Sequence, residues 1–135
     1  MRRLWQTSAP DRAAPTQGDD AISKKTVFLF PSYGLGQTDD AELKLKLAKK
    51  FLALVASTNP LPSQICFYTD GVKLCMTGSP VLDELRALDD RGVELVLCST
   101  CVETFGLRDQ VAVGIVGGMG DIIEAITHAD NSITL

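Results

Sequence analysis

The sequence is poor in the groups on which several common enzyme and cofactor sites depend. One tryptophan and one histidine occur among its 135 residues, and aromatic residues make up 6% of the chain. Without a second histidine or a Gly-x-Ser-x-Gly turn, a hydrolase triad has no obvious parts. His128 lies near the C-terminal end of an expected helix, where a solvated, positively charged histidine is favoured. No cofactor is predicted.

Long hydrophobic runs are also missing. No stretch approaches the roughly 18 consecutive apolar residues of a membrane-spanning helix. The first residues lack the apolar core of a secretory signal despite Arg2 and Arg3. We therefore expect a cytoplasmic protein with no membrane partner. In that reducing compartment its four cysteines are expected to be thiols.

Positive charge is limited. Lys and Arg number 13 against 17 Asp and Glu, which gives a formal net charge of −4. Five of the basic residues fall within residues 1–25, so the remainder of the chain is more acidic than the whole. Binding nucleic acid requires a basic surface and stacking aromatic side chains. We therefore expect no nucleic-acid partner.

Metal and nucleotide motifs are incomplete. The four cysteines are spaced 9, 23 and 3 residues apart, whereas structural zinc sites use closely spaced pairs of ligands. Gly34-Leu35-Gly36 resembles the start of a dinucleotide fingerprint, but Asp39 stands where the third glycine belongs. The sequence also has no Gly-Lys-Ser/Thr phosphate loop. Neither a metal site nor a nucleotide site is predicted.

Strand-like and helix-like patterns alternate along the chain. Apolar runs typical of strands cover residues 26–30, 64–68, 93–97, 111–116 and 132–135. The predicted helices run from a cap at Thr38 or Asp39 to Val55, from Ser79-Pro80 to Gly92, from a cap at Ser99 or Thr100, and over 121–129. The alternation predicts an α/β fold with a doubly wound, mostly parallel sheet of about five strands and helices on both faces.

The expected domain covers residues 26–135. Residues 1–25 lack apolar periodicity and are expected to form a disordered leader. In the first long helix, an apolar face is expected to pack on the sheet while lysines face solvent. The residues of this expected inner face are Leu43, Leu47, Ala48, Phe51, Leu52 and Val55.

The strongest candidate site is Cys98-Ser99-Thr100-Cys101, directly after the third predicted strand. Ligands and chemistry gather at this edge of a parallel sheet, and a nearby helix N-terminus lowers the pKa of a thiol. Two hypotheses follow. Cys98 carries a transferred sulfur as a persulfide, or Cys98 and Cys101 form a dithiol redox couple. Cys66 is expected in the core, whereas Cys75 lies in a loop that can reach the same edge.

A non-catalytic role is the alternative from a different class. The segment Asp70-Gly71-Val72-Lys73 and the glycine loop with Gly34 and Gly36 would then recognise a partner or a small ligand. Cys75 is a further contributor to this set. Four thiols of ordinary reactivity would favour such a binding or regulatory module, whereas one fast-reacting thiolate would favour chemistry.

Four segments carry a resemblance to a known family. They cover residues 67–74, 78–82, 92–101 and 105–107. These segments resemble the DsrE/DsrF-like superfamily and, within it, the C-terminal domain of YedF-type proteins linked to selenium metabolism. The resemblance runs from about Thr26 to Leu135.

The resemblance implies a compact domain that forms homo-oligomers, trimers or hexamers, and that acts as a sulfur-relay carrier or sulfurtransferase. In sulfur-relay members the acceptor cysteine follows a Gly-Val-x-Leu-x-x segment at a strand end, and residues 92–97 put Cys98 in that place. Those members continue into a small-residue, Arg-rich helix, whereas this chain has Cys101, Glu103 and Phe105.

The leader also departs from the YedF-type pattern. Proteins of that type carry an N-terminal TusA-like domain with a Cys-Pro-x-Pro motif, and residues 1–25 contain no cysteine. A TusA-like carrier partner is therefore expected to be a separate protein.

Overall fold

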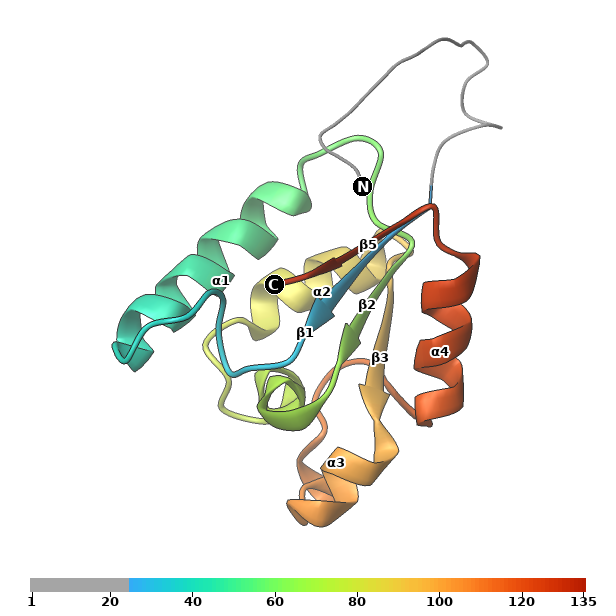
Figure 1. The fold of residues 1–135 in the computed structure, drawn as a ribbon. Coiled ribbons are helices and arrows are strands. Elements are labelled where there is room, and N and C mark those ends of the chain that lie inside the picture. The colour runs from blue at the N-terminus through green and yellow to red at the C-terminus, as the bar shows by residue number, and fades with distance from the viewer. Residues whose placement is uncertain (1–24) are drawn as a thin grey trace, which may run out of the picture.

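The computed structural model describes residues 25–135 (Figure 1). The predicted leader lies outside this range except for Lys25. The strands are β1 (Thr26–Phe30), β2 (Gln64–Phe67), β3 (Glu94–Cys98), β4 (Ile115–Gly117) and β5 (Asn131–Thr134). The helices are α1 (Ala41–Val55), α2 (Leu82–Asp90), α3 (Ser99–Thr104) and α4 (Met119–His128), with 3₁₀ helices η2 (Thr69–Cys75) and η3 (Arg108–Gln110).

All five strands form one sheet in the order β4-β3-β2-β1-β5, and every neighbouring pair is parallel. The predicted parallel α/β sheet is thereby confirmed. Phe30 pairs in register with Phe67, and Phe67 with Leu97, so β1, β2 and β3 end at the same level. The segments that leave these three strand ends, η2 and α3 among them, meet at one edge of the sheet.

Helices cover both faces of the sheet, as predicted (Figure 1). On one face, β-strand residues such as Phe30 and Phe67 pack with α1 and α2, and their rings stack with centroids 5.6 Å apart. On the other face, α4 packs through Ile122 and Ala125. Side chains alternate between the two faces along each strand, as the period of two requires.

The inner face of α1 differs from the prediction. Ala48, Leu52 and Val55 are buried, but Leu43 and Leu47 are 43% and 42% exposed. At 100° per residue, Leu43 and Leu47 lie roughly 100° to 180° around the helix from Ala48 and Leu52. The apolar surface of α1 is therefore wider than the part that the sheet covers.

Two helix starts also differ. Asp40, rather than Thr38 or Asp39, caps α1, and its Oδ1 accepts the Leu43 N–H at 3.0 Å. Helix α2 begins at Leu82, after a turn in which Ser79 Oγ accepts the Val81 N–H. The capping acceptor of α1 therefore lies at a different residue from those the pattern indicated, whereas Ser79 accepts an N–H as expected but the regular helix α2 begins only at Leu82.

The C-terminal elements are shifted as well. Strand β4 is shorter than the predicted 111–116 run because Gly114 takes a φ of 88° and Val111 instead bridges Met76 in antiparallel fashion. Helix α4 begins at Met119 rather than Asp121, since the Asp121 carboxylate accepts the Gly118 N–H at 2.8 Å one turn earlier.

Gly71 sets how closely η2 approaches the end of β1. It is buried, and a Cβ at this position would lie 1.8 Å from the carbonyl oxygen of Phe30. Two backbone hydrogen bonds tie the same junction, from Tyr68 N–H to Phe30 O at 3.2 Å and from Gly71 N–H to Tyr68 O at 2.9 Å. No side chain fits between the two segments.

Gly71→Ala is expected to lower the free energy of unfolding by at least about 2 kcal/mol, because backbone must move to admit a methyl group. Gly120→Ala is the matched control. Nothing lies within 4 Å of its Cβ position in α4, so alanine there is expected to be neutral or to stabilise by up to about 1 kcal/mol. Urea unfolding measures both, and equal stability of the two variants would contradict the account of Gly71.

Candidate functional site

Cys98 is the last residue of β3 and the N-cap of α3, with φ −69° and ψ 119°. Its partner across the sheet is Gly117, the last residue of β4. The chain therefore turns from strand to helix at Cys98 itself, and the predicted caps Ser99 and Thr100 form the first turn of α3. Cys101 follows within the same short helix.

The two thiols have different surroundings. Cys98 is 1% exposed and packs in the cluster beneath α4 with residues such as Val96 and Leu29. Cys101 is half-buried and contacts the clusters on both faces of the sheet. The Cys98 thiol lies close enough to Cys101 to raise the pKa of that thiol. The preference for Cys98 over Cys101 as the acceptor stays a prediction.

A residue outside the predicted site contacts Cys101. The backbone N–H of Thr69, at the start of η2, donates to Cys101 Sγ at 3.1 Å. Burial raises the pKa of the Cys101 thiol, the Thr69 N–H acts to lower that pKa, and the neighbouring Cys98 thiol acts to raise it. The Thr-Asp-Gly turn signal after β2 marks this position, but nothing in the sequence connects it to Cys101.

The predicted Asp70–Lys73 loop is the 3₁₀ helix η2, and it lies beside α3. Lys73 Nζ is 2.9 Å from Asp70 Oδ1 and 4.5 Å from the centre of the Phe105 ring, just after α3. The two charged groups of this loop thus contact partners within the chain. Gly71 is a packing residue, so the loop's composition reflects its fit against β1 and α3.

The glycine loop has a local structural role. Gly34 has a φ of 140°, and a Cβ there would lie 2.5 Å from Lys44 Cβ on α1. The next residue, Leu35, donates its N–H to the carbonyl oxygen of Lys44 at 3.0 Å. Gly36, with φ 83°, has open space around its Cβ position. Gly34 therefore allows the loop after β1 to lie against α1.

The other two cysteines are core residues. Cys66 is fully buried in β2, as predicted, and burial together with the charge of Glu94 raises the pKa of its thiol to about 11. Cys75 is also fully buried, at the end of η2. The interpretation of Cys75 as a residue of an open loop is therefore wrong, and burial raises the pKa of its thiol strongly.

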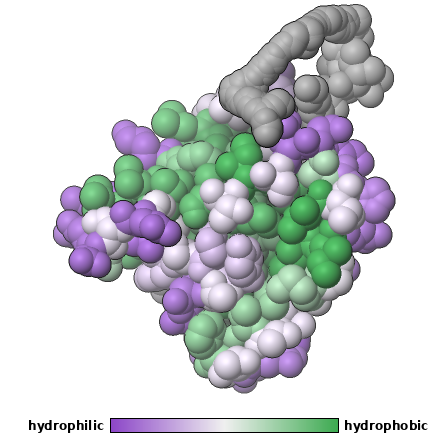
Figure 2. Space-filling model, viewed as in Figure 1, coloured by the Kyte–Doolittle hydropathy of each residue, from purple (hydrophilic) through white to green (hydrophobic). Residues whose placement is uncertain are grey.

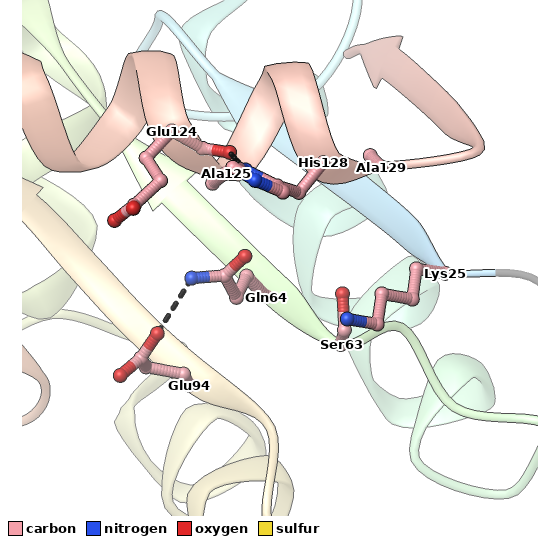
Figure 3. Close-up of a pocket in the computed structure, with 8 residues that line it drawn as sticks. All are labelled: Lys25, Ser63, Gln64, Glu94, Glu124, Ala125, His128 and Ala129. Atoms are coloured by element: carbon pink, nitrogen blue, oxygen red, sulfur yellow. Dashed lines mark hydrogen bonds between the residues drawn. The ribbon is translucent and has the colours of Figure 1, made fainter.

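A pocket of about 410 Å³ lies at the opposite edge of the sheet (Figure 3). There Gln64 Nε2 donates to Glu94 Oε1 at 2.6 Å, and His128 Nδ1 lies 2.9 Å from the carbonyl oxygen of Glu124. The lining residues are Lys25, Ser63, Gln64, Glu94, Glu124, Ala125, His128 and Ala129. Mostly polar residues from separate segments build it, and no sequence motif marks such an arrangement.

The described part of the chain, residues 25–135, also lacks two kinds of feature. No group of three or more His, Cys, Asp or Glu side chains in this range is placed to hold a metal ion. No helix in the same range is long and apolar enough to cross a membrane.

A comparison with models of protein families finds a match to this domain. The model of the DsrE/DsrF-like family matches residues 27–135, which includes every strand residue but Thr26. The chain belongs to the DsrE/DsrF-like family. A comparison with curated proteins finds no significant match.

Several solved structures share the fold. The ychN protein from E. coli is 18% identical with a TM-score of 0.61, over 82% of this chain and 99% of that chain. Protein MTH1491 from Methanobacterium thermoautotrophicum is 21% identical with a TM-score of 0.62, over 84% and 100%. BT1422 from Bacteroides thetaiotaomicron is 16% identical with a TM-score of 0.61, over 82% and 95%. At these identities the likeness shows the fold.

The thiols of this DsrE/DsrF-like domain are expected to react with an alkylating reagent in the order of their exposure to solvent. In native protein between pH 7 and 9, iodoacetamide is expected to modify Cys101 first, because the thiolate is the reactive form and access is required. Cys66 and Cys75 are expected to react only after unfolding in denaturant, since burial holds both thiols protonated. Peptide mapping by mass spectrometry measures the order. Labelling of native Cys75 as fast as Cys101 would contradict it.

Proposed function

We propose that the domain accepts and passes on sulfur, or selenium, as a persulfide-type adduct carried by Cys98. The observation that carries the proposal is the position of Cys98 at the end of β3, where α3 begins and brings Cys101 near it. Membership of the DsrE/DsrF-like family, which is associated with sulfur relay, supports it. The selenium alternative depends on the resemblance to YedF-type proteins.

The reaction is a sulfur exchange without net oxidation. A thiolate of the pair attacks the outer sulfur of a donor persulfide, the donor's S–S bond breaks, and the donor leaves as a thiolate. The burial of Cys98 then restricts the access of small thiols to the bound sulfur. Such shielding suits a carrier, whose cargo must survive until an acceptor arrives.

We further propose a cytoplasmic homo-oligomer, a trimer or hexamer, that exchanges sulfur with a separate TusA-like carrier. Exposed apolar side chains support association (Figure 2). Leu43, Leu47 and Leu54 lie on α1, and Ile123 and Ile126 lie on α4. The two groups lie on opposite faces of the sheet, and exposed apolar surface of this kind is typical of protein interfaces.

Incubation of the reduced protein with a cysteine desulfurase and cysteine, or with a small-molecule persulfide, is expected to add one sulfur atom to the wild type. Cys98→Ser is expected to lose the stable adduct, because the buried carrier thiol is gone. Intact-mass spectrometry without reductant measures the adduct. Cys66→Ser is the matched control, since Cys66 is a buried strand cysteine on the same face, and it is expected to load normally.

Wild-type protein that takes up no sulfur from either donor would overturn the proposal. Equal, lasting loading of wild type and Cys98→Ser would overturn the assignment to Cys98.

A thiol redox switch is the second candidate, and the closeness of the Cys98 and Cys101 thiols favours it. Mild oxidation with a disulfide reagent such as oxidised glutathione would then join the two sulfurs, with loss of two hydrogens to the reagent. Either single Cys→Ser change is expected to abolish this mass loss. Mixed glutathione adducts without an internal disulfide would count against the switch.

A further inference from the structure

The two thiols of the pair differ in how a donor can reach them. Cys98 is sealed between the sheet and α4, whereas Cys101 is half-buried at the edge and receives a backbone N–H. We propose that sulfur enters and leaves at Cys101, and that Thr69 is the positioning residue that holds the N–H donor on its sulfur. This proposal depends on the proposed function and assigns its order of events.

Thr69 is held in an unusual conformation. Among residues 25–135 it is the one non-glycine residue with a positive φ, 48°, a region that β-branched residues rarely adopt. Its hydroxyl Oγ1 hydrogen-bonds the carbonyl oxygen of Pro31, and the carbonyl oxygen of Tyr68 lies 2.7 Å away. Because Thr69 donates its N–H to Cys101 and its hydroxyl to Pro31, the hydroxyl contact helps to fix the position of the N–H donor.

The close fit of η2 against β1 also holds the Thr69 N–H in place. The Tyr68 N–H is bonded to Phe30 O, and Gly71 lies where no side chain fits. The peptide that carries the Thr69 N–H is therefore bracketed by fixed backbone on both sides. Such preorganised donors cost little reorganisation when charge develops on the acceptor.

The N–H is suited to both sulfur transfers. In the first, the Cys101 thiolate attacks the outer sulfur of the donor persulfide, whose S–S bond breaks to release a thiolate. In the second, the Cys98 thiolate attacks the outer sulfur of the Cys101 persulfide, and Cys101 leaves as a thiolate. Negative charge lies on Cys101 Sγ at the start of one step and the end of the other, where a hydrogen bond to it is strongest.

Lys73, the nearby cation of η2, is already engaged. Its ammonium contacts the Asp70 carboxylate at 2.9 Å and the Phe105 ring at 4.5 Å. The Thr69 N–H is the donor that the structure places on Cys101 Sγ. The Thr69 N–H, rather than the Lys73 ammonium, is therefore the group whose loss is expected to change the reactivity of Cys101.

The first test follows loading over time with a small-molecule persulfide donor, by quenched intact mass and peptide mapping. Cys101→Ser is expected to load roughly tenfold more slowly than wild type, since exchange rates follow access and thiolate character. Cys98→Ser is expected to load at the wild-type initial rate, with the sulfur on Cys101 and rapid loss to added glutathione. Wild-type loading kinetics in Cys101→Ser would overturn entry at Cys101.

The second test measures the pH dependence of Cys101 alkylation by iodoacetamide. Thr69→Val keeps the shape but removes the hydroxyl, so its profile is expected to move to higher pH, with a roughly fivefold lower rate at neutral pH. Thr69→Ser keeps the hydroxyl and is expected to restore the wild-type profile. If Thr69 has only a structural role, Thr69→Val changes the stability of the protein and leaves the pH profile of Cys101 alkylation unchanged, which would overturn the assignment.

A backbone variant covers the case in which Thr69→Val fails to fold. Replacement of the Thr69 amide by an ester, through the α-hydroxy analogue of threonine, removes the N–H and keeps the side chain. The same upward movement of the profile is expected, and an unmoved profile overturns the role of Thr69. If instead wild type takes up no sulfur while the Thr69 variants shift the profile, the proposed function fails and the donor assignment stands.

Discussion

The site depends on the close contact between the end of β1 and the start of η2. Because Gly71 has no side chain, the backbone of η2 lies directly against Phe30, and that position determines where Thr69 stands. Thr69 in turn determines which group faces Cys101. A rare backbone conformation persists when its surroundings specify it, and such residues cluster at functional sites. The conformation of Thr69 is therefore part of the site.

Strand periodicity distributes the cysteines. In β3, Leu95 and Leu97 face α1 and α2, while Val96 and Cys98 face α4. The same alternation puts Cys66 of β2 on the α4 face. Cys98 differs from Cys66 in that its strand ends there, so the following helix can bring a second thiol into contact. Position at a strand end, and not burial, separates the candidate carrier from the core cysteine.

The sheet, its parallel order and the strand-end cysteines were predictable because they follow from short-range patterns, alternation and apolar runs. The Thr69–Cys101 contact was not, since it joins residues 32 apart through the fit of η2 on β1. The inner face of α1 was predicted too wide, because apolar periodicity does not say how much of a helix the sheet covers. Cys75 was predicted to be a loop residue for a related reason. A turn signal marks a change of chain direction, whereas the burial of a residue depends on which elements pack against it.

Burial also confers selectivity among four thiols in one small domain. A buried thiol that has neither a nearby positive charge nor a second thiol beside it stays protonated, because the thiolate loses hydration that nothing replaces. Cys66 and Cys75 meet this condition, and the pKa of each is raised. Cys101 is also partly desolvated, but a fixed N–H opposes the rise in its pKa and solvent reaches its side chain. The Thr69 N–H, which the close contact at Gly71 positions, thus distinguishes the exchangeable sulfur of Cys101 from the inert sulfurs of Cys66 and Cys75.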